Sequence, residues 1–148
     1  MNLHLLKLFP AQVAKYWNEL GPMVEQTLPP SANGSRMTNV LQAILSGRLE
    51  MLQYYDQSES GEARIIGLAV VGIVDNIDYS SKDMLIYAVY AYGQSSKQEV
   101  VDGFRLLVDY ARGIGCDAVI AYTNLPGLVK YIKRLGGQAD YTFLRLEV

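Results

Sequence analysis

The sequence has almost no cysteine or histidine, since each occurs only once, as Cys116 and His4. A zinc site needs three or four Cys, His or carboxylate ligands that converge on one point, so we expect no metal centre. A single cysteine cannot form a disulfide within the chain, which is typical of proteins from a reducing compartment. With the one histidine near the N-terminus, a catalytic relay of the Ser-His-Asp or Cys-His kind is difficult to build.

Long hydrophobic runs and an excess of positive charge are also missing. The longest apolar run, from Ile65 to Val74, is roughly half as long as a membrane-spanning helix must be. The N-terminus lacks the pattern of a secretory signal. The formal net charge is -2, whereas nucleic-acid binding needs clustered Lys and Arg. We therefore expect no membrane or nucleic-acid partner, and a cytoplasmic protein or one carried in a particle that assembles in the cytoplasm.

What the chain does have is the composition of one folded domain. It contains 148 residues, of which 50% are apolar and 19% are charged. A chain of that size can bury a core without disulfides or metals. No internal repeat, low-complexity tract or linker divides it, so we predict a single domain over residues 1–148.

Apolar periodicity and turn residues predict strands and helices in a definite order. Strands are expected at Asn2–Leu8, Glu50–Tyr55, Ala63–Asp75, Asp83–Tyr92, Asp117–Thr123 and Tyr141–Val148. Helices are expected at Ala11–Thr27, where Gly21-Pro22 interrupts the pattern, at Met37–Leu45, at Ser96–Ile114 and at Leu128–Leu135. A helix that connects two neighbouring strands makes them parallel, so the fourth and fifth strands are expected to run parallel.

This order of elements resembles the Gcn5-related N-acetyltransferase (GNAT) fold over essentially the whole chain. The segment LLVDYARGIGCDAVIAYTN is similar to the family's crossover helix and fifth strand, with Ala111 and Gly115 where the family favours Ala and Gly. LVKYIKRLGG is similar to the following helix and its closing glycine. The resemblance implies an α/β fold with a mixed, mostly antiparallel sheet, parallel fourth and fifth strands, and about four flanking helices.

Two segments, LQAILSGRLEMLQYY and RLLVDYARGIGCDAV, further resemble short GNAT-like proteins encoded by bacteriophages. Those proteins pair an SGR helix end with a later WA-x-x-x-GC segment, whose Trp is Tyr110 here. The resemblance implies a phage origin and adds no mechanism.

The resemblance places a cofactor loop after the fourth strand. In active family members this loop has the form R/Q-x-x-G-x-G/A, and its amides hold the pyrophosphate of coenzyme A. Here Gln94 matches the first position, but Lys97 and Glu99 stand where the two glycines are expected. The resemblance implies that acetyl-CoA contacts Val89, Tyr90, Ala91, Gln94, Ser95, Ser96, Lys97 and Gln98. The alternative is an ordinary helix start, because Ser96 and Glu99 have the spacing of a capping box.

The resemblance also implies where the acetyl group is transferred. A backbone donor for the thioester carbonyl is expected within Val89–Ala91. Asn124 matches a frequent Asn at the end of the fifth strand, and Tyr131 has the offset of the family's tyrosine acid. Counting back from Gly136 places Ile132 at that position instead, so the alternative for Tyr131 is a packing or surface role.

Acidic residues near strand ends are the candidates for a base. They are Glu50, Asp75 and Asp78. Each also fits an ordinary solvated turn, Asp75-Asn76 in particular.

Tyrosines are concentrated in the central strands. They are Tyr54, Tyr55, Tyr79, Tyr87, Tyr90 and Tyr92. Alternation predicts Tyr90 and Tyr92 on one face of the sheet and Tyr87 on the other. Such a set can line a binding site or an interface, or reflect β-propensity and core packing.

Three functions stay open on these grounds. The first is an N-acetyltransferase that moves an acetyl group from acetyl-CoA to an unknown amine by direct attack. The second is a GNAT-like protein without catalysis that serves as a phage accessory or virion-associated protein, with a second copy or a phage structural protein as partner. The third is a small-molecule or peptide-binding domain that uses the tyrosines.

Overall fold

The computed structural model describes residues 2–57, 59–78, 80–123 and 126–148. The strands in this part of the chain are β1 (Leu3–Lys7), β2 (Leu49–Gln57), β3 (Ala63–Asp75), β4 (Lys82–Ala91) and β5 (Ala118–Ala121). The helices are α1 (Pro10–Lys15), α2 (Trp17–Thr27), α3 (Arg36–Leu45), α4 (Lys97–Gly113) and α5 (Pro126–Arg134). Long periodic segments of the sequence therefore form the elements that were predicted for them.

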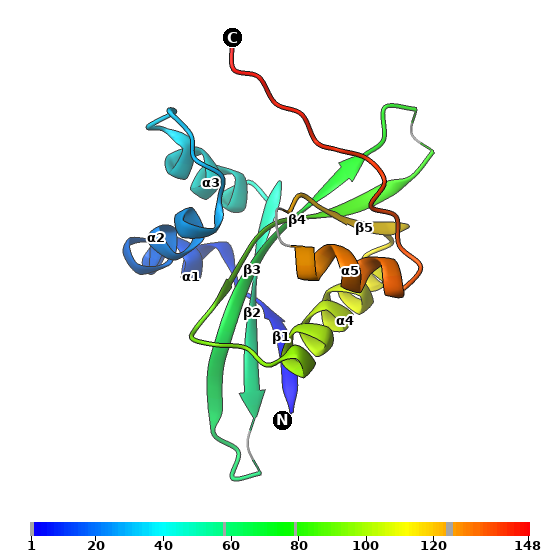
Figure 1. Cartoon of the computed structure of the whole chain (residues 1–148). Coiled ribbons are helices and arrows are strands. Elements are labelled where there is room, and N and C mark those ends of the chain that lie inside the picture. The colour runs from blue at the N-terminus through cyan, green and yellow to red at the C-terminus, as the bar shows by residue number, and fades with distance from the viewer. Residues whose placement is uncertain (1, 58, 79, 124–125) are drawn as a thin grey trace.

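The strands form one sheet in the order β1-β2-β3-β4-β5 (Figure 1). The neighbours from β1 to β4 are antiparallel, whereas β4 and β5 are parallel. The parallel pair follows from α4, which carries the chain from the end of β4 back to the start of β5. The predicted mixed sheet with parallel fourth and fifth strands is confirmed.

Helices cover both faces of the sheet, and each face has its own hydrophobic core. In Figure 1, α1, α2 and α3 lie on one side of the sheet, and α4 and α5 lie on the other. The core beside the first three helices contains Val13, Leu20, Val24, Leu28, Val40, Ile44, Met51, Leu68, Val70 and Ala88. The core beside α4 contains Leu52, Tyr54, Ala69, Val71, Met84, Leu107 and Ala111. The continuous apolar run of β3 is thus explained, since its alternate residues enter opposite cores.

The first predicted helix is divided at Tyr16, and the predicted interruption at Gly21-Pro22 is wrong. Pro22 lies inside α2, and the break is a single non-helical residue, Tyr16, with φ -105° and ψ 17°. Gly21 has a packing role, because a Cβ there would lie only 3.2 Å from the ring of Trp17. The glycine thus leaves room for the indole of Trp17 instead of ending the helix.

The C-terminal segment, residues 138–148, forms no strand, so the predicted strand Tyr141–Val148 is wrong. Its side chains are mostly exposed, with Leu144 at 85% and Leu146 at 86%. The ring of Phe143 contacts that of Tyr122, just beyond β5, at a centroid distance of 4.5 Å. Apolar spacing shows that a segment suits a sheet, but a strand forms only where its backbone groups find a paired neighbour.

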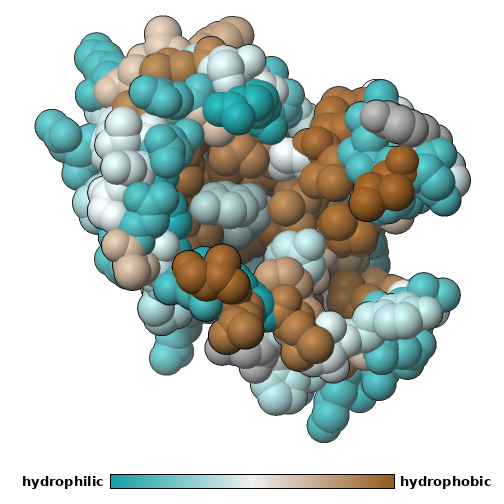
Figure 2. All heavy atoms as spheres, turned by 90° about the horizontal axis from the view of Figure 1, so that it is seen from above, coloured by the Kyte–Doolittle hydropathy of each residue, from teal (hydrophilic) through white to brown (hydrophobic). Residues whose placement is uncertain are grey.

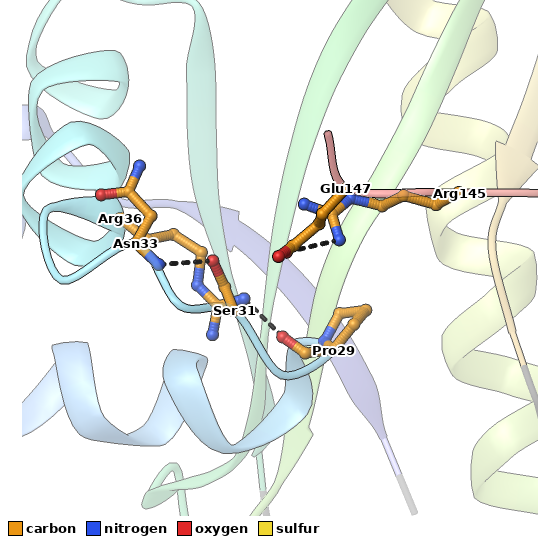
Figure 3. A network of polar contacts seen from close by, with 6 residues as sticks. All are labelled: Pro29, Ser31, Asn33, Arg36, Arg145 and Glu147. Atoms are coloured by element: carbon orange, nitrogen blue, oxygen red, sulfur yellow. Dashed lines mark hydrogen bonds and ion pairs between the residues drawn. The ribbon is translucent and has the colours of Figure 1, made fainter.

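Among the described residues, this segment has one side-chain ion pair, and both partners belong to the segment. Arg145 forms an ion pair with Glu147 at 2.9 Å (Figure 3), and the same figure draws the polar contacts of the loop that precedes α3. That loop has contacts of its own, from the Asn33 amide to Ser31 Oγ (3.1 Å) and from the Arg36 guanidinium to the Pro29 carbonyl. Figure 2, which looks down on the end where the C-terminus lies, shows hydrophobic residues at the surface around a central hollow.

Candidate active site at the open edge of β4

Strands β4 and β5 pair over a short stretch and then separate. Their register runs from Asp83 opposite Ala118 to Ile86 opposite Ala121. The start of the pair is held by two hydrogen bonds between Lys82 and Asp117. The Lys82 amide donates to Asp117 Oδ2 (2.9 Å), and the Asp117 amide donates to the Lys82 carbonyl (2.7 Å). Beyond Ile86, β4 continues to Ala91 with no β5 partner among the described residues.

A β-bulge marks the point of separation. On β3, Val70 pairs with Ala88 and Val71 pairs with Ile86, so Tyr87 is the extra residue. Bulges bend a strand and increase its twist, which turns the second half of β4 away from β5.

The bulge also corrects the predicted arrangement of tyrosines. Tyr87 and Ala88 both pack in the core beside α1–α3. Tyr92 faces the same side, because its hydroxyl donates to Met23 Sδ of α2 at 3.3 Å, and its ring contacts that of Tyr90. The three tyrosines Tyr87, Tyr90 and Tyr92 therefore share one face, because the extra residue breaks the alternation on which the prediction relied.

The hydrogen bond from the Tyr92 amide to the Ile66 carbonyl (2.8 Å) shows which backbone groups of β4 face β3 and which face the open edge. Backbone N–H and C=O groups alternate in direction along a strand, so those of Tyr90 and Tyr92 point to β3. Val89 and Ala91 consequently direct their N–H and C=O groups to the open edge. The side chain of Val89 is 47% exposed. This edge can thus supply hydrogen-bond donors to an extended ligand.

Gly67 of β3 allows the two strands to approach closely at this edge. It lies opposite Ala91. A Cβ at Gly67 would lie 2.5 Å from the Tyr90 carbonyl oxygen, which no side chain can accommodate without a shift of the backbone.

The predicted cofactor loop follows directly, and α4 begins at Lys97. Gly93 has φ +92°, a left-handed conformation that favours glycine. Ser96 is the N-cap, and its Oγ accepts a hydrogen bond from the Glu99 amide at 3.1 Å. The amides of residues 94–98 donate no hydrogen bond to another described residue. The structure therefore brings together the predicted residues of β4 and of the loop at one end of the open edge.

Of the two predicted catalytic residues, the structure describes only Tyr131. Asn124 lies outside the described residues. Tyr131 is half-buried on α5, and its ring meets Phe104 of α4 edge-on at 5.9 Å. Ile132, the alternative for the same position, packs against the closing turn. A Cβ at Gly137 would lie only 2.5 Å from Ile132 Cγ2, so glycine leaves room for this side chain. The acid role of Tyr131 stays a prediction.

The predicted bases lie away from the open edge. Glu50 pairs with Val71 of β3, and its carboxylate receives Lys7 Nζ at 3.2 Å and the hydroxyl of Tyr110. Burial and the Glu50 carboxylate raise the pKa of Tyr110, so this phenol stays protonated. The Ser80 amide donates to Asp78 Oδ1 (3.0 Å), and hydrogen bonds from Ser80 lower the pKa of Asp78, as in an ordinary turn. Asp75 ends β3 opposite Lys82.

Sequence reasoning missed the side of the site that α2 contributes. Glu19 and Met23 are one helical turn apart, so they lie on the same face of α2, the face that meets Tyr92. The signal was present in the i, i+4 spacing, but no pattern in the sequence connects α2 with β4.

Two cavities elsewhere on the surface do not include this edge. One, of about 280 Å³, is lined by Gly47, Arg48, Glu50, Val71, Gly72, Ile73, Met84 and Ile114. The other, of about 240 Å³, lies between α3 and Tyr87. Among the described residues, no three Cys, His, Asp or Glu side chains converge on a metal-sized site, and no helix is long and apolar enough to cross a membrane.

Comparison with solved structures identifies the fold as that of GNAT acetyltransferases. A GNAT family acetyltransferase of Staphylococcus aureus has a TM-score of 0.64 at 18% identity, with 100% of both chains covered. An acetyltransferase of Trypanosoma brucei has a TM-score of 0.62 at 19% identity, with 99% of this chain and 100% of its own covered. A Bacillus halodurans protein described as a transcriptional regulator has a TM-score of 0.66 at 12% identity, with 99% and 100% covered. At such low identity these similarities establish the fold alone. No protein-family model and no curated protein matches the sequence.

Proposed function

We propose that this protein is an N-acetyltransferase that transfers an acetyl group from acetyl-CoA to an amine by direct attack. The observation that carries the proposal is the open edge of β4, where the backbone groups of Val89 and Ala91 pair with no other described residue beyond the end of β5. Two of the structures with this fold are acetyltransferases, which supports the same chemistry.

The residues at this edge fit acetyl-CoA at two places. The amides of residues 94–98, which donate to no other residue that the structure describes, and the N-terminal end of α4 favour a phosphate group. The exposed Lys97 adds a positive charge. The open edge at Val89 and Ala91 fits the thin amide-containing arm. The loop lacks the glycines of active family members, and the Ser96 hydroxyl already occupies the Glu99 amide. The fit therefore depends on the amides that precede Glu99.

The reaction needs a donor for the carbonyl oxygen and a proton for the departing sulfur. Bound acetyl-CoA supplies an activated thioester. The amide of Val89 or Ala91 can donate to its carbonyl oxygen as negative charge develops there. The neutral amine nitrogen forms a bond to the carbonyl carbon as the carbon–sulfur bond breaks, and the proton that the nitrogen then loses passes to water. Tyr131 is the proposed acid for the thiolate and Asn124 the proposed polar group beside it, both as the family resemblance implies.

Calorimetric titration with acetyl-CoA tests the proposal. Lys97→Glu places a negative charge at the proposed pyrophosphate site, and we expect it to weaken binding about five- to tenfold. Lys15→Glu makes the same charge change on α1, where Lys15 lies 5.5 Å from the ring of Tyr16, and should leave affinity unchanged. If millimolar acetyl-CoA produces no heat of binding and no rise in the melting temperature, the proposed function is excluded. It would favour the phage accessory or virion-associated role that the sequence segments suggested.

A further inference from the structure

Helix α2 and the end of β4 together form a small polar and aromatic surface. The Tyr92 hydroxyl donates to Met23 Sδ at 3.3 Å, which fixes α2 against the last residues before the loop. Glu19 lies one turn before Met23 on the same helix face. The carboxylate of Glu19 is therefore on the side of α2 that faces Tyr92.

The two tyrosines of this surface have their rings in contact. Tyr90 and Tyr92 meet edge-to-face, with centroids 5.3 Å apart and planes at 90°. Tyr92 is 40% exposed, so its ring is accessible to a ligand. Burial raises the pKa of Tyr92, and the Tyr90 phenol and the Glu19 carboxylate raise it further, in agreement with the position of Glu19 on this face of α2.

The charge of Glu19 is uncompensated in the described part of the chain. Its side chain is exposed and forms no hydrogen bond or ion pair with another described residue. A free carboxylate beside two aromatic rings attracts cations, since the ring faces carry negative charge density. The same surface repels an anion, so it does not suit the phosphates of acetyl-CoA.

This surface adjoins the proposed site of acetyl transfer. Ala91, whose amide faces the open edge, lies between Tyr90 and Tyr92 in the sequence. We propose, on the basis of the function proposed above, that Glu19, Tyr90 and Tyr92 bind a positively charged group of the acceptor other than the amine that is acetylated. The acceptor is then a diamine, or an amine that carries a second cationic group.

The charge must belong to a second group because the attacking nitrogen has to be neutral. A carboxylate close to an amine favours its ammonium form and so opposes attack. Glu19 therefore assists transfer only if it holds a charge a short distance from the reacting nitrogen, leaving that nitrogen free to lose its proton.

Two amines of equal chain length test this inference, butane diamine and butylamine. Binding of each is measured by calorimetry in the presence of coenzyme A, and acetylation with acetyl-CoA is measured in parallel. We expect the wild-type protein to acetylate the diamine faster than butylamine, and Glu19→Gln to lower diamine acetylation about fivefold. Butylamine carries its only positive charge on the nitrogen that must react, so its acetylation should change little in Glu19→Gln. Tyr92→Leu should act like Glu19→Gln, and Tyr92→Phe, which keeps the ring, should retain most of the preference. High salt should reduce the preference of the wild type.

Glu25→Gln is the matched control. Glu25 is exposed on α2 but lies about 120° around the helix from Glu19 and about 160° from Met23, so the preference should persist in this variant. Equal acetylation rates for the two amines, or an equal loss in Glu25→Gln, overturns the inference. Failure of acetyl-CoA to bind removes the acetyltransferase function, yet the diamine titration still decides whether this surface binds cations.

Discussion

Replacing Gly67 by alanine should destabilise the protein through one contact. The added Cβ would lie 2.5 Å from the Tyr90 carbonyl oxygen, well below the 3.4 Å at which ordinary contacts begin. The clashing atom belongs to the backbone, so β3 and β4 must move apart. Overpacking of this kind costs about 1 to 3 kcal/mol. In a domain of this size that corresponds to a melting temperature lower by about 3 to 9 °C.

The same substitution at Gly103 is the control, because its expected sign is opposite. Gly103 lies within α4, and a Cβ there would meet the ring of Tyr54 at 3.6 Å, an ordinary contact. Alanine also favours the helix over glycine, so Gly103→Ala should stabilise by about 0.5 to 1 kcal/mol. Urea and thermal unfolding followed by circular dichroism measure both variants. An unchanged or higher melting temperature in Gly67→Ala would refute the close approach of β3 and β4.

Gly67→Ala should also weaken acetyl-CoA binding if the proposed function is correct. The displaced stretch of β4 contains Val89 and Ala91, whose amides face the open edge. A loss of affinity measured well below the melting temperature separates this effect from unfolding. Affinity equal to that of the wild type would mean that the cofactor does not use this part of β4.

Three further predictions concern stability. Deleting residues 138–148 should change the melting temperature by no more than about 2 °C, because the segment pairs with no strand; a much larger fall would mean that it is a strand in solution. Tyr110→Phe removes one partner of the Glu50 carboxylate and should cost about 1 to 2 kcal/mol in urea unfolding, whereas Tyr55→Phe, which removes no hydrogen bond recorded between described residues, should be nearly neutral. Burial raises the pKa of Tyr54, so stability should be complete below the ordinary tyrosine pKa and decrease as the pH rises above it; this alkaline loss should be smaller in Tyr54→Phe, and an identical pH profile would contradict the assignment.

The elements with strong periodicity could be predicted because their local pattern already reflects burial. The apolar run of β3 required burial on both faces, and the spacing in α4 required one buried helix face. The prediction of a C-terminal strand was wrong because strand pairing is not a local property. The sequence of Tyr141–Val148 suits a strand, but pairing depends on an available edge elsewhere in the sheet.

The candidate site divides in the same way. The family resemblance proposed Gln94–Gln98 and Val89–Ala91 as cofactor contacts, and this role stays a prediction. Their position at the end of a strand and the start of a capped helix follows from a local pattern. The contribution proposed for Glu19 was not predicted from the sequence, since it depends on how α2 packs against β4. Tyr87 was assigned to the wrong face because a bulge inserts one residue, and the residue across the ladder that creates it is distant in the sequence.

By itself, the sequence determined the order of the central strands and helices, the parallel course of β4 and β5, and the helix start at Ser96. Each of these depends on contacts or connections between residues that are close along the chain. Only the tertiary structure decided where β4 parts from β5, that the backbone groups of Val89 and Ala91 face the open edge, and which side chain of α2 reaches Tyr92. These features depend on register and packing between distant segments, which the local chemistry of each segment does not specify.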